Sequence, residues 1–141
     1  MNCNLFRDSV EISDAKKVVS AALEKGRQMN FQIAAAVVDV RGSVLVAEKM
    51  EGASALTTQL AEGKAAAAAL LGRSIRDLYQ SVQENPAFWV GVSGLTGWRL
   101  LFGKGGVVIR KDGKVVGAVG VSGARADEDD VVAEFAANSI Q

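Results

Sequence analysis

Two lysines, Lys49 and Lys64, lie in stretches of mostly small or apolar residues. Lys64 lies next to Gly63 inside an alanine-rich stretch, and Lys49 ends an apolar run. An ammonium group at the mouth of a pocket would hold the carboxylate of a ligand, and a desolvated lysine can also become reactive. The alternatives are a solvated lysine on a packed helix for Lys64 and an exposed strand edge for Lys49. Both lysines are candidate ligand-binding residues.

A second candidate site is the sequence GKGG at residues 103–106, which Arg99 closely precedes. Such a run exposes several backbone N–H groups, which together with Arg99 and Lys104 would cradle an anion. Gly105 and Gly106 are therefore candidate ligand-binding residues. The other interpretation is a tight connection that needs positive φ angles. A Walker phosphate loop is excluded, because the glycine–lysine pair is not followed by serine or threonine.

Glycines recur at every third residue near the end of the chain, at Gly117, Gly120 and Gly123, and four acids follow at residues 127–130. The spacing lacks the close first pair of a dinucleotide fingerprint, and acids at a helix start repel phosphate. A calcium loop spreads its ligands along a longer stretch. Gly117 and Gly120 therefore indicate close packing of a strand, and the chain is expected to turn at residues 122–123. The residues left as candidates for lining a pocket are Ser122, Gly123 and Arg125.

Apolar periodicity predicts the elements that must position these residues. Helices are expected over residues 13–28, 54–72, 74–83 and 127–138, and β-hairpins over residues 31–50 and 107–122. After Pro86, the glycine-punctuated residues 89–106 are expected to be irregular. Gly63 costs the second helix about 1 kcal/mol relative to Ala, which suggests that another segment approaches its backbone. The order indicates one α+β domain with a mostly antiparallel sheet.

Four aromatic residues gather in and beside the segment that is expected to be irregular. They are Phe88, Trp89, Trp98 and Phe102. Aromatic side chains in such a segment stack on a flat cofactor or fill a core or a subunit interface. Core or interface is the favoured interpretation of this cluster.

Composition excludes several classes of function. The 141 residues include 16 basic and 16 acidic residues and 49% apolar residues, which fits a single globular domain over residues 1–141. Without net charge or a basic run, nucleic acid is not an expected partner, and no apolar stretch suits a membrane span. The N-terminus lacks signal-peptide features, which predicts a cytoplasmic protein. The absence of histidine excludes histidine-dependent catalysis, and no metal site is expected with a single cysteine.

Five stretches resemble the GlcG/HbpS-like family, which is also found as the C-terminal domain of PduO-type adenosyltransferases. They are VVDVRGSVLV, KMEGA, AEGKAAAA, GKGG and GKVVGAVGVSGA with the following DEDDVVA. The resemblance spans about residues 13–138. It implies a profilin-like α+β fold with a five-stranded antiparallel sheet, in the order α-β-β-α-α-β-β-β-α, and assembly into dimers or larger homo-oligomers. Some relatives bind haem, and others are encoded beside catabolic enzymes.

The sequence departs from the family pattern at two places. Lys49 stands where members usually have arginine, and lysine cannot reproduce bidentate binding by arginine. Val107 follows the double glycine where members usually have a proline soon after it. The absence of histidine also argues against carrying over a histidine-ligated haem site. Tyr79 and Met50 are candidate weak haem ligands, but nothing in the sequence selects them.

Three functions are compatible with the sequence. The favoured hypothesis is an accessory protein of a catabolic pathway that binds haem, or another flat anionic cofactor such as a flavin, in an apolar pocket rimmed by Lys49 and Lys64. The second is a small enzyme that acts on an anionic hydroxy or keto acid, with Lys64 or a carboxylate as acid or base. The third is an oligomeric accessory subunit that stabilises a partner enzyme.

Overall fold

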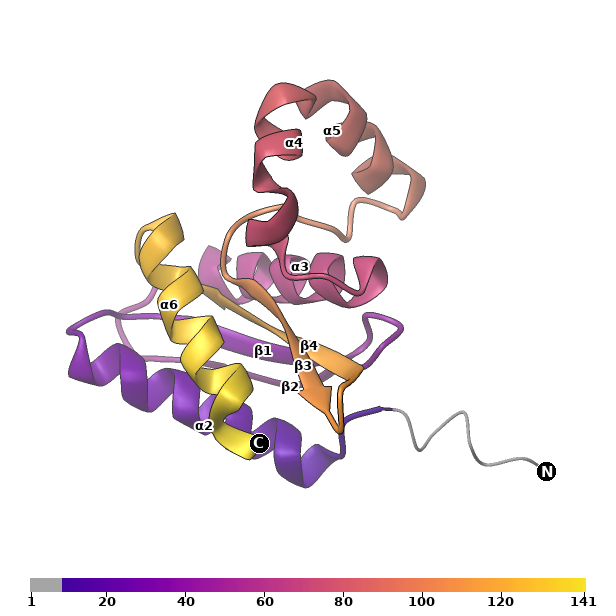
Figure 1. Ribbon diagram of the computed structural model, residues 1–141. Helices are drawn as coiled ribbons and strands as arrows, with labels where there is room; N and C mark the ends of the chain where they lie inside the picture. Colours follow the sequence, from indigo (N-terminus) through magenta and orange to yellow (C-terminus); the bar gives the residue numbers. More distant parts are fainter. Residues whose placement is uncertain (1–8) are drawn as a thin grey trace.

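One antiparallel sheet of four strands forms the centre of the molecule (Figure 1). The computed structural model describes residues 9–141, and its strands lie in the order β2-β1-β4-β3. All neighbouring pairs are antiparallel, which confirms the expected α+β class. The strands are β1 (Ala34–Val38), β2 (Val44–Lys49), β3 (Gly106–Lys111) and β4 (Lys114–Ser122).

Helices cover both faces of the sheet, and a helical hairpin of α4 and α5 projects beyond α3 (Figure 1). On one face lie α2 (Ile12–Gln28) and α6 (Ala126–Ala137), and on the other lies α3 (Leu56–Leu71). Within residues 9–141, no helix combines the length and the apolar character that a bilayer span requires. The remaining helical segments are η1 (Ile75–Leu78), α4 (Tyr79–Glu84), α5 (Pro86–Leu95) and η2 (Asn138–Ile140).

The sheet packs very closely against α3 because small residues line both surfaces. On β1 and β4 these are alanines and Gly120, and on α3 they are the alanines that follow Lys64. A Cβ atom added at Gly120 would overlap the carbonyl oxygen of Ala61, so only glycine permits this approach. All five residues of β1 are buried, so both faces of this strand are covered.

The first part of the segment that was expected to be irregular, residues 89–95, belongs to helix α5. Pro86 occupies the first turn of α5, where its missing N–H costs no hydrogen bond. At the other end, Gly97 takes a positive φ of 75° and the Trp98 N–H donates to the Ser93 carbonyl at 2.7 Å. These two features end the helix as a left-handed cap does. The expectation of an irregular stretch is therefore wrong for residues 89–95.

Residues 99–102, which we call the strap, cross α3 and do not join the sheet. The Leu101 N–H donates to the Gly63 carbonyl at 3.1 Å, and a Cβ atom added at Gly63 would lie 3.1 Å from the Leu101 Cβ. This confirms the expectation that a segment approaches the backbone at Gly63. Because the strap pairs with α3, it supplies no further strand, and the sheet within residues 9–141 has four strands and not five.

Candidate functional site

The residues that the sequence singled out gather at one end of the sheet. In the strand register, Lys49 at the end of β2 lies opposite Ala34, and Ala34 lies opposite Ser122 at the end of β4. β3 begins at the same end with Gly106, which pairs with Gly120. The structure therefore brings the candidates from distant parts of the sequence together, but it divides them into a buried group and a pocket.

The buried group is centred on Lys64, which is only 7% exposed. Its Nζ donates to Asp129 Oδ2 at 3.0 Å and to the Val121 carbonyl at 3.0 Å. The Ala124 N–H donates to the other carboxylate oxygen of Asp129 at 3.0 Å. Burial raises the pKa of the Asp129 carboxyl, and the charge of Lys64 opposes this increase. The ammonium group of Lys64 thus joins α3 to β4 and α6.

The GKGG turn packs directly on this ion pair. Gly105 has a φ of 110°, and a Cβ atom added there would lie 3.0 Å from the Asp129 Cβ and 3.3 Å from the Lys64 Nζ. A Cβ atom added at Gly106 would overlap the Lys64 carbonyl oxygen. Gly106 therefore permits close approach of β3 to α3, and Gly105 permits close approach of the turn to β4 and α6. A role of Lys64, Gly105 and Gly106 in binding a ligand stays a prediction.

A polar pocket, which we call the sheet-end pocket, lies beside this group and has a volume of about 420 Å³. The exposed Lys49 reaches its wall, where the Nζ donates to the Ala53 carbonyl at 3.0 Å. The first turn of α3 also borders it through Thr57 and contains no acidic residue. Ser122 is buried beside this pocket. The lining residues are Asn30, Phe31, Gln32, Gly52, Ala53, Ser54, Thr57 and Gly123.

The chemistry of the sheet-end pocket suits a small anion with hydrogen-bonding groups. Amide and hydroxyl side chains line it, the Lys49 ammonium stands at its wall, and the N-terminal end of α3 carries the positive end of the helix dipole. Arg125 is exposed on the neighbouring turn before α6, where its N–H donates to Glu128 Oε1 at 3.1 Å.

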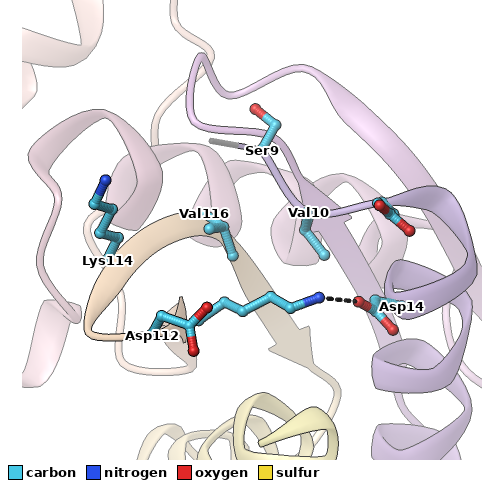
Figure 2. A pocket seen from close by; sticks show the side chains of 8 residues that line it. Ser9, Val10, Asp14, Asp112, Lys114 and Val116 are labelled. Carbon is cyan, nitrogen blue, oxygen red and sulfur yellow. Dashed lines mark hydrogen bonds and ion pairs between the residues drawn. The ribbon is translucent and has the colours of Figure 1, made fainter. Parts of the chain in front are cut away.

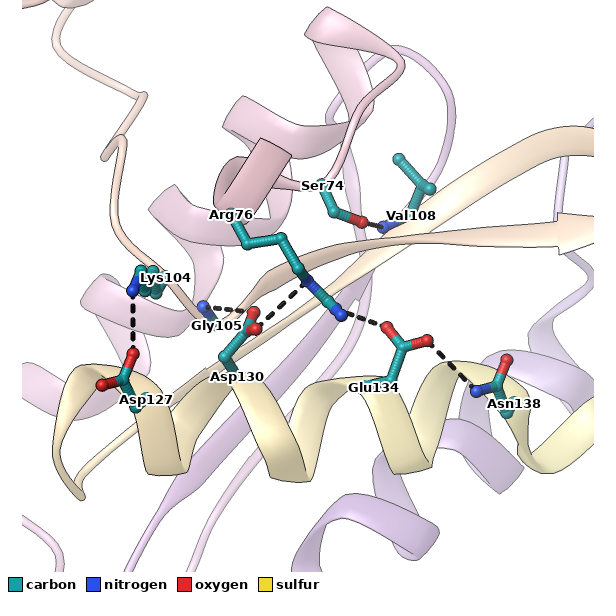
Figure 3. A network of polar contacts seen from close by, with 9 residues as sticks. All are labelled: Ser74, Arg76, Lys104, Gly105, Val108, Asp127, Asp130, Glu134 and Asn138. Carbon is teal, nitrogen blue, oxygen red and sulfur yellow. Dashed lines mark hydrogen bonds and ion pairs between the residues drawn. The ribbon is translucent and has the colours of Figure 1, made fainter. Parts of the chain in front are cut away.

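The acids that begin α6 already have partners within the chain (Figure 3). Asp127 accepts from Lys104 Nζ at 2.8 Å, and Asp130 lies 3.1 Å from Arg76 Nε. Arg76 also pairs with Glu134. The hydrogen bond from Asp127 raises the pKa of the Lys104 ammonium. Burial raises the pKa of the Asp130 carboxyl, while the charge of Arg76 opposes it. These acids fasten α6 to η1 and to the GKGG turn.

A second hollow, of about 270 Å³, lies at the β3–β4 turn near the start of α2 (Figure 2). Lys111 Nζ donates across it to Asp14 Oδ2 at 3.4 Å. Lys114 and Asp112 add one charge of each sign to its lining. Among residues 9–141, no group of three His, Cys, Asp or Glu side chains could hold a metal ion. The hollow therefore has no feature that selects a ligand.

Sequence reasoning missed an apolar groove between the strap and the α4–α5 hairpin. Its volume is about 190 Å³, and we call it the aromatic groove. The rings of Trp89 and Phe102 lie 4.8 Å apart in it, and Ser93 Oγ donates to the Leu100 carbonyl at 2.7 Å. The aromatic cluster was the only sequence signal for it. The lining residues are Val82, Pro86, Trp89, Val90, Ser93, Leu100, Leu101 and Phe102.

The model of the family described as haem-degrading protein HbpS-like matches residues 10–138. An uncharacterised 15.0 kDa protein of Citrobacter freundii, from the dhaT–dhaS intergenic region, is 29% identical over 128 residues, which are 91% of this chain and 89% of that protein. The corrinoid adenosyltransferase PduO of Salmonella typhimurium is 28% identical over 94% of this chain, which spans only 39% of PduO.

A solved structure shares the fold over nearly the whole chain. The crystal structure of a PduOC–haem complex superposes with a TM-score of 0.83 at 25% identity, and the match covers 94% of this chain and 96% of that chain. The fold described above is thus the fold of a protein that has been crystallised with haem.

Proposed function

Because the chain belongs to the HbpS-like family, we propose that it is a haem-binding accessory protein that serves a catabolic pathway in the cytoplasm. The proposal includes the profilin-like fold type and assembly into a homo-oligomer. A related structure with bound haem supports it. In this chain, the observation that carries it is the aromatic groove, whose lining side chains are all apolar except Ser93.

The aromatic groove can contact the flat faces of a porphyrin ring, but its lining offers no ligand for the iron. Trp89 and Phe102 offer flat apolar surfaces on which such a ring stacks. The sequence contains no histidine, and the single hydroxyl in the lining, that of Ser93, donates to Leu100. None of the lining side chains is therefore suited to ligate the iron. Haem, when bound, would supply the redox chemistry of its iron.

Two cations flank the apolar residues 100–102 of the strap in sequence and are our candidates for holding the porphyrin carboxylates. Arg99 precedes the strap's apolar residues and donates from Nη2 to the Gly42 carbonyl at 3.3 Å. Lys104 follows them, with its Nζ 4.9 Å from the centre of the Tyr79 ring. Neither of the two earlier candidate iron ligands, Tyr79 and Met50, lines the aromatic groove, and the Met50 sulfur already accepts from the Ile33 N–H at 3.4 Å. The proposal therefore assigns no axial ligand from this chain.

Titrations with haem, metal-free protoporphyrin IX and FMN, followed by absorbance, test this function. We expect saturable binding of both porphyrins with affinities within about threefold of each other, since the ring and not the iron is held. Trp89→Ala and Leu101→Gln should each weaken binding about tenfold or more. Phe135→Ala, an aromatic truncation on α6, is the matched control. Absence of porphyrin binding would contradict the proposal, and tight binding of FMN alone would identify a flavin as the ligand.

The sheet-end pocket favours a second candidate function, the binding or turnover of a small hydroxy or keto acid. Its support is the Lys49 ammonium at the wall of a pocket that also borders the acid-free first turn of α3. In this proposal Lys49 and the backbone at Gly123 bind the acid, and Ser122 and Arg125 border the site. Lys64, Gly105 and Gly106 hold the neighbouring wall in place.

Calorimetry with a panel of hydroxy and keto acids, combined with assays for product, tests this second function. We expect Lys49→Gln to weaken binding about tenfold, which corresponds to about 1.4 kcal/mol. Lys114→Gln removes an exposed lysine at the opposite end of β4 and is the control. Equal affinities of the wild type and Lys49→Gln would remove the site from consideration.

A further inference from the structure

Trp98, which directly precedes the strap, holds a backbone conformation that a bulky residue rarely adopts. Its φ is 64°, and its side chain is among the exposed large hydrophobic groups, at 70%. A left-handed backbone is strained at such a residue, and strain of this kind gathers at functional sites. The chain recovers little of this cost by burying the ring. Packing of the fold therefore does not explain the position of the indole.

The indole ring lies against α5 and lines a hollow that we call the indole pocket. A Cβ atom added at Gly94 would lie 3.3 Å from the ring atom Cζ2, so glycine at this position lets the ring lie close to the helix. The pocket has a volume of about 220 Å³ and lies between α3, the β1–β2 hairpin and residues 98–99. None of its lining residues lines the aromatic groove or the sheet-end pocket.

A carboxylate and a guanidinium group line the indole pocket without pairing. They belong to Glu62, which is half-buried on α3, and to Arg99. Within residues 9–141, neither group forms an ion pair with any residue. The two charges are therefore available to a ligand in the pocket.

The β1–β2 turn positions the guanidinium group of Arg99. Its Nη2 donates to the Gly42 carbonyl at 3.3 Å, and a Cβ atom added at Gly42 would lie 3.1 Å from this nitrogen. Glycine thus lets the turn approach the guanidinium group closely. Because a guanidinium group carries five N–H donors, Arg99 keeps donors for a ligand.

These groups together fit a small molecule that carries both a positive and a negative charge. A ligand carboxylate can accept two parallel hydrogen bonds from a guanidinium group, and a cationic nitrogen is attracted both by a carboxylate and by an indole ring. Val44 and Ala66 add apolar surface to the lining. The volume of about 220 Å³ is below the ~300–1,000 Å³ of pockets for drug-sized ligands. It therefore suits a ligand no larger than an amino acid.

We propose that the indole pocket binds a small zwitterion, an α-amino acid or a betaine, with its carboxylate on Arg99 and its cationic nitrogen at Glu62 and Trp98. A ligand with only a negative charge would be repelled by Glu62, and one with only a positive charge by Arg99. The inference goes beyond the proposed functions and does not rest on them. Since Arg99 is also our candidate for one porphyrin carboxylate, a porphyrin and a zwitterion would compete for it.

Calorimetric titrations with two zwitterions and with molecules that keep only one of their charges test this site. The zwitterions are L-valine and glycine betaine. The single-charge analogues are isovalerate and isobutylamine for valine, and tert-butylacetate and tetramethylammonium for betaine. We expect a zwitterion to bind with a Kd below about 1 mM, and its analogues about tenfold or more weakly, since each lacks one charge contact. Tighter binding of valine would identify an amino acid, and tighter binding of betaine a quaternary ammonium compound.

Substitutions in the pocket separate the two charge contacts. Arg99→Gln should weaken binding of the zwitterion about tenfold but not that of its cationic analogue, and Glu62→Gln should do the same but spare the anionic analogue. Trp98→Asn supplies a residue that tolerates a left-handed backbone, so we expect weaker binding without a lower urea midpoint of unfolding. Arg110→Gln and Glu48→Gln, at exposed positions outside the pocket, are the matched controls.

Three outcomes would overturn the inference. They are the absence of saturable binding of both zwitterions, equal affinities for a zwitterion and its analogues, and wild-type affinity in both Arg99→Gln and Glu62→Gln. Trp89→Ala, which should weaken porphyrin binding, should leave zwitterion binding unchanged, because Trp89 does not line the indole pocket. Failure of the zwitterion site and failure of the proposed porphyrin site are therefore distinguishable.

Discussion

Lys64 is a buried charge whose partner comes from a distant part of the chain. The ammonium group and the Asp129 carboxylate lie 3.0 Å apart, with side chains that are 9% and 3% exposed. Such a pair adds little net stability, because desolvation offsets much of the attraction. Its loss is costly all the same, since one charge would remain buried without a partner. Sequence spacing of 65 residues hides this pairing from any local pattern.

We expect Lys64→Met to lower the free energy of unfolding by about 3–5 kcal/mol at pH 7. Lys64 opposes the raised pKa of Asp129, so its removal raises that pKa further. The ordinary pKa of an aspartate is near 4. As the pH falls, the Asp129 carboxyl of the folded variant is therefore protonated before that of the unfolded chain, which favours the folded state. The deficit should therefore shrink at pH 5.

Urea unfolding of the wild type and Lys64→Met at pH 7 and pH 5 measures this effect. The double variant Lys64→Met/Asp129→Leu is the control, because removing both charges should restore stability to within about 1–2 kcal/mol of the wild type. An equal deficit of Lys64→Met at both pH values would contradict this account of the pair.

At the scale of elements, the strap decides the shape of the aromatic groove. It is held on α3 by the hydrogen bond from Leu101 to Gly63 and at α5 by the one from Ser93 to Leu100. The strap thus links the projecting hairpin to the body of the molecule. If the aromatic groove binds a porphyrin as proposed, a change at Gly63, which is far from Trp89 and Phe102 in sequence, should act on binding through the strap.

We expect Gly63→Val to weaken porphyrin binding about tenfold while the helix content stays unchanged. The added side chain would begin 3.1 Å from the Leu101 Cβ, and overpacking of this kind shifts the backbone at a cost of about 1–3 kcal/mol. Circular dichroism and absorbance titration measure the two effects. Leu70→Val, at an exposed position on the same helix, controls for the lower helix propensity of valine. If Gly63→Val binds porphyrin as tightly as the wild type, the strap does not shape the site.

For the molecule as a whole, local sequence patterns predicted the elements that carry a local signal. The helix at residues 13–28 and the two hairpins were expected from periodicity and turn residues, and the structure has them. Gly117 and Gly120 were expected to permit close packing, and a Cβ atom added at either would meet backbone atoms of a neighbouring segment.

The rest depends on contacts that no local pattern encodes. Helix α5 was missed because glycines punctuate it and no charged face gives it an amphipathic period. The sheet has one strand fewer than expected within residues 9–141, because the strap pairs with α3. The pairing of Lys64 with Asp129 was also missed, because the two residues are 65 positions apart. The alternative of a solvated Lys64 is wrong, since this residue is buried.

The two tryptophans occupy different surroundings, and this gives the protein a built-in optical probe. Trp89 is half-buried against Phe102 in the aromatic groove, while Trp98 is 70% exposed beyond the end of α5. Their emission should differ in colour, with Trp98 at the longer wavelength of a hydrated indole. A Trp98→Phe variant would leave Trp89 as a single fluorophore, which reports occupancy of the groove by quenching without any label.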